Sequence, residues 1–306
     1  MNDQRLPVPQ RVVASAALAE RLIVAQFPDW ARLPVHPVPV NGWDNTTFRL
    51  GEELLIRLPT AAEYALAVEK EQFWLPRLAS ALPLRIPVPR ATGVASADFE
   101  HPWSIYEWLP GETLASCLAA AQCGKTVVEP NALAGDLSGF LIALQRFDAR
   151  EGPQPGIHNW YRGAPLSTYR SSAAGAIDAL SGEIDGNRAR RLMGEALESE
   201  YRGVDRWLHG DLAAGNLLVE QGRLSAVIDF GSSGVGDPAC DYAAAWTLLE
   251  PDGRELFREL LGVGDADWAR GRGWALWKTL LRAVTAKRDG DAQEWADSRR
   301  LLEAIC

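Results

Sequence analysis

Apolar residues recur at helical spacing in several stretches of the chain, with shorter β-prone runs between them. The N-terminal spacing predicts a helix over Val12–Phe27 that ends before Pro28. Three runs bounded by turn residues follow and are predicted to be short strands: Val38–Val40, Thr46–Leu50 and Leu54–Leu58. The chain is therefore expected to open with a helix and a small set of strands.

Helical patterns dominate the rest of the chain. Ala62–Ala79 is predicted to be a helix with a run of charges in its middle, and Trp103–Leu109 reads as a strand. Further helical segments are predicted at Leu114–Ala121, Ala132–Phe147, Ser167–Leu180 and Arg188–Tyr201, from Asp241 to Glu250, and in the C-terminal region. The apolar face of the second of these segments is expected to be core.

Two β-prone runs that flank a short polar turn carry the clearest chemical signal. Leu217–Val219 and Leu224–Ile228 predict a hairpin. Asn216 enters its first strand and Asp229 leaves its second strand. Because an antiparallel hairpin brings those two ends together, the amide oxygen and the carboxylate are expected to reach one site.

Asp211 stands on the loop before this hairpin and is expected to join the same cluster. Transfer of a phosphoryl group from a nucleotide needs one carboxylate near the acceptor hydroxyl and separate oxygen ligands for magnesium. We assign the first role to Asp211 and the second to Asn216 and Asp229. Asp211 is expected to accept or orient the hydroxyl proton by geometry, because an ordinary Asp pKa is near ~4. His209 either braces the loop or acts directly.

These residues also have the order and spacing of a known motif. Protein kinases carry H-R-D-x-x-x-x-N followed by D-F-G, and this chain reads His209-Gly210-Asp211, then Asn216, then Asp229-Phe230-Gly231. With Gly after the His and a later Gly236-Asp237-Pro238 and Asp241, the chain resembles the kinase-like phosphotransferases, specifically the aminoglycoside phosphotransferase family. By this resemblance Asp237 and Asp241 anchor the catalytic loop, with helix capping as the alternative.

The resemblance implies an α+β, bilobal protein-kinase-like fold. A small antiparallel-sheet N-lobe over residues 1–107 would bind the nucleotide, and a mostly helical C-lobe over residues 108–306 would carry the catalytic loop and the acceptor site. Only a short connection separates Gly231 from Asp237, which leaves no room for the activation segment of a protein kinase.

The glycine-containing bend Asn41–Thr46 lies where this fold would place a loop over the nucleotide phosphates. By resemblance, Trp43, Asn45 and Thr46 belong to that loop. Trp43 either covers the nucleotide or packs against the protein.

Arg57 stands where the kinase pattern has a lysine that grips the phosphates and pairs with a helix Glu. Arginine supplies the charge but not the same geometry, and the alternative is a surface arginine on an edge strand. By resemblance Glu71 is the partner of Arg57. Glu69 is the second choice, and a solvated run of charges is the alternative for both.

The run Trp103–Leu109 resembles the fifth strand and hinge of a kinase-like chain. By this resemblance the backbone groups of Glu107 and Leu109 bind the adenine, and Tyr106 lines the pocket behind it. The cofactors implied are ATP, or GTP in its place, and Mg²⁺.

The net charge, the apolar runs and the cysteine spacing limit which partners and which cellular location we expect. A net charge of -9 argues against a general nucleic-acid or anionic-membrane binder and would suit a cationic acceptor. No run approaches the ~18 apolar residues of a membrane span, and Met1–Gln10 does not read as a signal peptide, so a cytoplasmic location is expected. The four cysteines have no metal-ligand spacing and are expected to be reduced thiols: Cys117, Cys123, Cys240 and Cys306.

By resemblance the acceptor is a small-molecule hydroxyl, with an aminoglycoside-type antibiotic first and a macrolide, a choline-like compound, a sugar or an amino-acid alcohol as alternatives. The segment His158–Gly163 either borders the acceptor or is a plain loop. An acidic patch near the C-terminus either favours an amine-bearing acceptor or is a solvated helix face: Asp289, Asp291, Glu294 and Asp297.

The rival functions are a protein kinase and a noncatalytic nucleotide-binding module. Either a monomer or a homodimer is expected.

Overall fold

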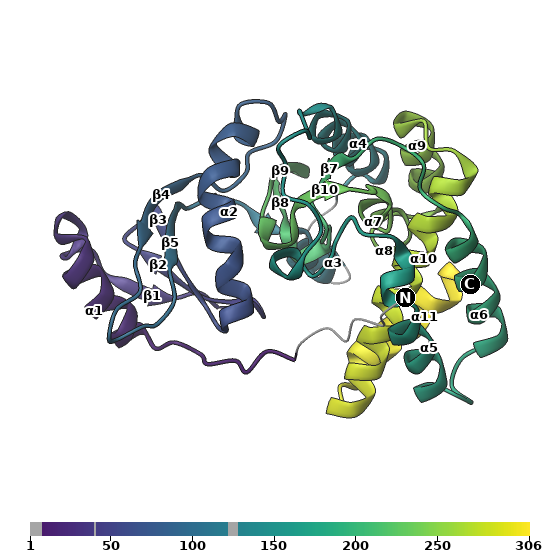
Figure 1. Cartoon of the computed structure of the whole chain (residues 1–306), viewed down its shortest axis with the longest axis horizontal. Coiled ribbons are helices and arrows are strands. Elements are labelled where there is room, and N and C mark those ends of the chain that lie inside the picture. Colours follow the sequence, from purple (N-terminus) through teal and green to yellow (C-terminus); the bar gives the residue numbers. More distant parts are fainter. Residues whose placement is uncertain (1–7, 40, 122–127) are drawn as a thin grey trace.

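A five-stranded antiparallel sheet forms one end of the molecule in the computed structural model, which describes residues 8–39, 41–121 and 128–306 (Figure 1). Its strands lie in the order β1-β2-β3-β5-β4. Their bounds are Val35–Pro37 (β1), Asn45–Leu50 (β2), Leu54–Pro59 (β3), Pro89–Gly93 (β4) and Trp103–Glu107 (β5). The pairing of β2 with β3 is regular over all six residues of each strand, which fixes which side chains face the core.

Two helices pack against this sheet. Helix α1 (Ala16–Gln26) begins at Ser15, whose hydroxyl accepts the N–H of Leu18 at 3.2 Å. Its buried Leu22 belongs to the same core as Phe48, Ile56 and Trp103 of the sheet. Helix α2 (Ala62–Ala79) lies between the sheet and the rest of the chain (Figure 1). It is therefore placed to carry side chains toward both parts.

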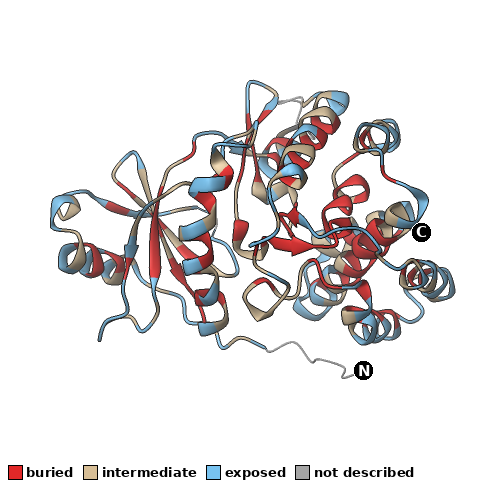
Figure 2. Cartoon of the chain, turned by 45° about the horizontal axis from the view of Figure 1, so that its top comes forward, coloured by how far each residue is buried: buried red, intermediate tan, exposed pale blue. Residues whose placement is uncertain are grey.

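The second part of the molecule is mostly helical, with two small sheets at its face toward α2 (Figure 1). Its helices are α3 (Leu114–Ala121), α4 (Pro130–Arg146), α5 (Arg170–Ala179), α6 (Gly186–Glu198), α7 (Ala239–Tyr242), α8 (Ala244–Thr247), α9 (Pro251–Leu261), α10 (Asp265–Asp289) and α11 (Ala292–Ile305). Helix α10 is central, because α5, α6, α7 and α11 all pack against it. Most of the buried apolar residues lie in this part (Figure 2).

The two small sheets flank the segments that contain the predicted site residues. One sheet joins β6 (Glu112–Thr113), β8 (Leu217–Glu220) and β9 (Arg223–Val227), and the other joins β7 (Arg206–Leu208) to β10 (Gly234–Gly236). The polar loop from His209 to Asn216 therefore begins at the end of β7 and leads into β8.

The α+β architecture with a small antiparallel-sheet lobe and a mostly helical lobe is confirmed, as are the bounds of α2 and α3 and the β8–β9 hairpin. The strand predicted at Val38–Val40 is wrong where the structure describes it: β1 ends at Pro37, and Val40 lies outside the described residues. Proline cannot donate to a ladder, so Pro39 disfavours pairing there. The first helix begins at Ala16 rather than Val12, because Ser15 caps it.

The helical segment expected from Asp241 to Glu250 is interrupted, because the chain there forms the short helices α7 and α8 before α9 starts at Pro251. Proline at the first turn of a helix has no orphan N–H to satisfy, so Pro251 favours a new start. Cys117, Cys240 and Cys306 are free thiols, and Cys123 lies outside the described residues. In the ranges that the structure covers, no helix has the length and apolar character to cross a bilayer.

Candidate active site

The hairpin brings Asn216 and Asp229 together at its open end. Leu217 pairs with Val227 in the β8–β9 ladder, and the N–H of Ile228 donates to the carbonyl of Asn216 at 2.9 Å. Asn216 in turn donates through Nδ2 to the backbone oxygen of Asp211 at 2.9 Å and lies 3.5 Å from its Oδ2. The amide of Asn216 therefore links the loop of Asp211 to the strand end that carries Asp229.

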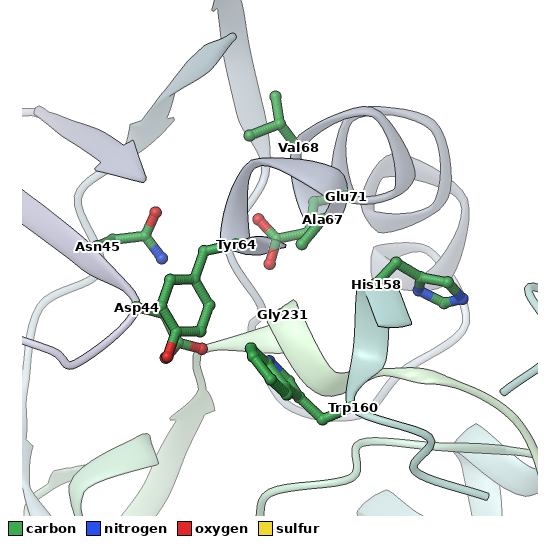
Figure 3. Close-up of a pocket in the computed structure, with 9 residues that line it drawn as sticks. All are labelled: Asp44, Asn45, Tyr64, Ala67, Val68, Glu71, His158, Trp160 and Gly231. Carbon is green, nitrogen blue, oxygen red and sulfur yellow. The ribbon is translucent and has the colours of Figure 1, made fainter. Parts of the chain in front are cut away.

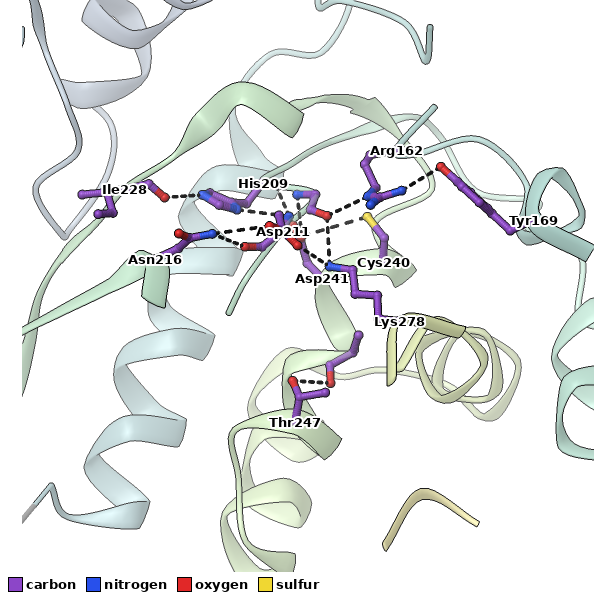
Figure 4. A network of polar contacts seen from close by, with 12 residues as sticks. Arg162, Tyr169, His209, Asp211, Asn216, Ile228, Cys240, Asp241, Thr247 and Lys278 are labelled. Carbon is purple, nitrogen blue, oxygen red and sulfur yellow. Dashed lines mark hydrogen bonds and ion pairs between the residues drawn. The ribbon is translucent and has the colours of Figure 1, made fainter. Parts of the chain in front are cut away.

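His209 braces this loop from beneath and is fully buried. Its Nδ1 accepts the N–H of Asp211 at 3.2 Å, and its Nε2 lies 3.0 Å from the carbonyl of Ile228 (Figure 4). Its ring meets that of Phe230 edge-on. Asp241 holds the same turn, because its two oxygens accept the N–H groups of His209 and Gly210, both at 2.7 Å. These contacts favour the bracing role for His209 over a direct one.

Gly210 turns the chain in a way that other residues cannot. Its φ is +86°, and a Cβ at this position would lie 2.4 Å from the carbonyl oxygen of Ser232. The carbonyl of Gly210 accepts from Arg162 Nε at 3.1 Å and from Lys278 Nζ at 3.2 Å. The glycine that distinguishes this motif from H-R-D therefore allows a tight turn whose oxygen faces two cations.

We predict that Gly210→Ala destabilises the fold by about 2 kcal/mol or more, because it combines a left-handed backbone with a backbone clash. The measurement is denaturant unfolding of both proteins. Gly215→Ala is the matched control on the same loop, since nothing lies within 4 Å of a Cβ there. Equal stabilities of the two variants would contradict the steric account.

Asp211 has charged neighbours that the sequence did not reveal. Lys278 Nζ lies 3.0 Å from its Oδ1, and Arg162 donates to the carbonyl of the preceding residue, Gly210. Burial acts to raise the pKa of Asp211, but the charges of Lys278 and Arg162 outweigh it and lower the pKa to about 2. The carboxylate is therefore ionised throughout the physiological range, as a group that orients a hydroxyl requires.

Arg57 joins the two lobes. Its guanidinium lies 3.4 Å from Glu71 Oε2 and 2.6 Å from Asp229 Oδ1. The hydroxyl of Tyr106 also donates to Glu71 Oε2, while Glu69 is exposed on the other side of α2. Burial acts to lower the pKa of Arg57, but Glu71 and Asp229 outweigh it and raise the pKa, so the guanidinium stays charged.

Lys70, the neighbour of Glu71 in sequence, makes a second connection between the lobes. Its ammonium donates to the carbonyls of Gly231 at 2.7 Å and Ser233 at 2.8 Å, and its side chain is almost fully buried. The helix that carries Glu71 is thereby attached to the loop that follows Asp229.

The bend predicted to cover the phosphates closes over the start of α2. The hydroxyl of Thr60 donates to the carbonyls of Trp43 and Asp44 at 3.0 and 3.1 Å. Trp43 is 63% exposed beneath Arg11, and the buried hydroxyl of Thr46 accepts the N–H of Ala14 at 3.1 Å. Trp43 therefore does not pack into the core.

Asn45 lines a small cavity of about 10 Å³ between this bend, α2 and the turn at Trp160 (Figure 3). Asp44 and Glu71 line it as well. Burial, and then the neighbouring carboxylate of Asp229, raise the pKa of Asp44 to about 7. Several carboxylates thus gather where a cation would relieve their repulsion.

The residues predicted to form the hinge lie at the end of β5 and just after it. The N–H of Glu107 donates to the carbonyl of Val88 at 3.2 Å, and its carboxylate pairs with Arg85 at 2.8 Å and Arg90 at 2.7 Å. Leu109 is buried in a small cluster with Leu218 of the hairpin. Tyr106 lies fully buried behind them, which joins the hinge to the core of the second lobe.

Comparison with known proteins shows which family the chain belongs to. Residues 36–274 match the model of the phosphotransferase enzyme family. The chain belongs to that family. The viomycin phosphotransferase of Streptomyces vinaceus is 30% identical over 230 residues, which are 71% of this chain and 75% of the relative. The aminoglycoside 3'-phosphotransferase of Escherichia coli is 27% identical over 169 residues, which are 49% and 59% of the two chains.

Solved structures of the same kind share the fold of this phosphotransferase. A GDP complex of aminoglycoside 2'-phosphotransferase-IIIa superposes with a TM-score of 0.69 at 20% identity, covering 95% of this chain and 98% of that one. Macrolide 2'-phosphotransferase type I gives 0.61 at 18% identity, with 95% and 98% covered. The bilobal kinase-like fold is thereby confirmed. The chain is a phosphotransferase with an alcohol group as acceptor.

The polar groups of this phosphotransferase fit a magnesium ion. Asn216 uses its Nδ2 toward Asp211, which leaves its amide oxygen for a cation, and Arg57 engages Oδ1 of Asp229 rather than Oδ2. Among the described residues no three His, Cys, Asp or Glu side chains form a metal site by themselves. Magnesium in such enzymes takes one or two protein ligands and completes its shell with water and phosphate oxygens.

The acidic patch predicted to attract an amine lies at the end of α10 and the start of α11, and its charges are engaged. Asp289 pairs with Arg288, Glu294 with Arg282 and Asp297 with Arg300, while Asp291 caps α11 by accepting the N–H of Glu294. These contacts favour a solvated helix face.

Proposed function

We propose that this phosphotransferase transfers the γ-phosphoryl group of ATP, or of GTP, to a hydroxyl of an antibiotic, with an aminoglycoside-type acceptor as the first candidate. The observation that carries the proposal is the convergence of Asp211, Asn216 and Asp229 at the open end of one hairpin, beside the Arg57–Glu71 pair. The names of the relatives support the acceptor class, since they act on viomycin and on aminoglycosides.

In the proposed reaction the acceptor hydroxyl donates its hydrogen bond to Asp211. The acceptor oxygen forms a bond to the γ-phosphorus, the bond from phosphorus to the bridging oxygen breaks, and the nucleoside diphosphate leaves with that electron pair. The hydroxyl proton passes to Asp211 and then to solvent. Because the low pKa of Asp211 makes it a weak base, its contribution is orientation more than proton abstraction.

The nucleotide is proposed to bind between the lobes assigned to residues 1–107 and 108–306. The backbone of Glu107 and Leu109 would bind the base beside Tyr106, and Arg57, fixed by Glu71, would contact the phosphates under the loop of Trp43, Asn45 and Thr46. Asn216 and Asp229 would hold magnesium, which would supply positive charge to offset that of the phosphates.

A screen of acceptors by product mass tests the proposal. Viomycin, kanamycin and a macrolide are each incubated with the protein, magnesium and either ATP or GTP, and with a chelator as control. We expect a phosphorylated product with at least one acceptor, and none when the chelator is present. Turnover of a non-antibiotic alcohol alone would reassign the acceptor. Nucleotide binding without any transfer or hydrolysis would favour the noncatalytic module.

A further inference from the structure

A lysine from a distant helix touches the carboxylate at the centre of the site. Lys278 of α10 places its Nζ 3.0 Å from Asp211 Oδ1 and 3.2 Å from the carbonyl of Gly210 (Figure 4). Sixty-seven positions separate it from Asp211, and it belongs to no motif of the catalytic loop. Its side chain is 16% exposed, so the ammonium is largely removed from water.

The packing of helix α10 fixes the backbone of this lysine. On the preceding turn Trp274 packs on Tyr169 with ring centroids 4.8 Å apart, and Trp277, next to the lysine in sequence, packs on the same ring at 4.2 Å. The indole N–H of Trp277 also donates to Ser172 at 3.1 Å. These contacts fix the backbone of Lys278 beside the Gly210 turn, from which its largely buried side chain reaches Asp211.

Arg162 is a second cation that contacts the Gly210 turn. Its Nε donates to the same Gly210 carbonyl at 3.1 Å, and its Nη1 donates to Tyr169 at 2.9 Å. The turn is therefore held by two cations. Only Lys278 makes a direct ion pair with the Asp211 carboxylate among the described residues.

The two oxygens of Asp211 are held unequally. Lys278 is bonded to Oδ1 at 3.0 Å, whereas Oδ2 has Asn216 Nδ2 at 3.5 Å, the limit of a hydrogen bond. Oδ2 is therefore the oxygen that remains available to a substrate hydroxyl. Removing an ammonium from water is costly, and an apolar side chain would often stabilise the fold as well. The lysine at this position is therefore better explained by its contact with Asp211 Oδ1 than by stabilisation of the fold.

We infer that Lys278 is a positioning residue for phosphoryl transfer: it fixes Oδ1 of Asp211 so that Oδ2 faces the acceptor hydroxyl. The inference rests on the proposed function, because it gives Asp211 the orienting role. Lys278 acts through Asp211 and leaves nucleotide binding to the residues around Arg57. Its loss therefore lowers kcat and spares nucleotide affinity.

The test compares Lys278→Met with Lys287→Met in the full chain. Lys287 is the matched control, since it lies on the same helix and makes one exposed ion pair with Glu183 at 2.7 Å. Turnover of magnesium-ATP is measured with water as acceptor and with any acceptor that yields product, and nucleotide affinity is measured by titration. We expect Lys278→Met to lower kcat on the order of 100-fold with nucleotide affinity within about twofold of native, because a misplaced group costs about that much. Lys287→Met should match the native protein.

A second comparison separates positioning from support of the fold. In an Asp211→Asn background, Lys278→Met should cause little further loss of kcat, because the lysine has no carboxylate to orient. Lys278→Arg should recover part of the rate. If Lys278→Met does not fold, Lys278→Gln serves in its place with the same expected direction.

The outcomes are distinct. Native kcat in the Lys278 variant, or losses that multiply in the double variant, would overturn the inference. A parallel fall in nucleotide affinity and thermal stability would overturn it as well, because it would show a structural role. Failure of the native protein to turn over nucleotide with or without an acceptor would instead count against the proposed function.

Discussion

Asp211→Asn is expected to lower kcat by about 100- to 10,000-fold, the range attributed to a positioned group that handles a proton in the transition state. Asparagine keeps the size of the side chain and its place beside Asn216 and Lys278, but it presents a neutral amide to the acceptor hydroxyl. Nucleotide affinity should change little, because Arg57 contacts Glu71 and Asp229 rather than Asp211. Single-turnover transfer and nucleotide titration measure the two quantities.

The control for this variant is Asp178→Asn, which neutralises an exposed carboxylate paired with Arg190 on the surface. It should keep native kcat. If Asp211→Asn also kept native kcat, the carboxylate would not orient the acceptor, and the catalytic assignment of the whole cluster would have to be abandoned.

Arg270→Met is expected to lower the free energy of unfolding by about 3–5 kcal/mol, the cost of leaving one partner of a buried ion pair alone. Arg270 Nε lies 2.7 Å from Asp237 Oδ2, and both side chains are nearly inaccessible to water. Asp237 also accepts the N–H of Ala239, the first residue of α7, at 3.1 Å, so it anchors the segment that follows Gly231 to the start of that helix. Unfolding by denaturant measures the loss.

Arg190→Met is the matched control for Arg270→Met, because it breaks an exposed pair of similar length, 2.6 Å, with Asp178. Exposed pairs contribute about 0–1 kcal/mol, so the control should remain close to the native protein. A loss of the same small size for Arg270→Met would show that the buried pair does not hold the segment in place.

The parts of the fold that could be predicted from sequence have strong local signals. Helix α2 has a long apolar period, and the β8–β9 hairpin has two β-prone runs around a turn with glycine. The pairing of β7 with β10 could not be predicted, because each strand has three residues and β10 reads Gly-Val-Gly. Strands of that kind depend on the partner that tertiary structure supplies.

Some residues of the candidate site could likewise be identified from sequence, and others only from the fold. His209, Gly210 and Asp211 are adjacent in sequence, so a motif could identify them, and the structure explains the glycine by its left-handed turn. Lys278 had no local signal, because a lysine in a helix gains its role only from the residues that the fold places beside it. Lys70 stood within a charged run, and only its burial distinguishes it from the exposed Glu69.

The strand β10 has a consequence for how such a protein would be controlled. It occupies the stretch between Gly231 and Asp237 in which a protein kinase carries its regulatory phosphosite, and Gly236 within it approaches the backbone of Gly163 so closely that a Cβ would lie 2.4 Å from that carbonyl. The close packing leaves no room for an inserted activation segment in that stretch, so phosphorylation of such a segment is not a means of switching this enzyme on.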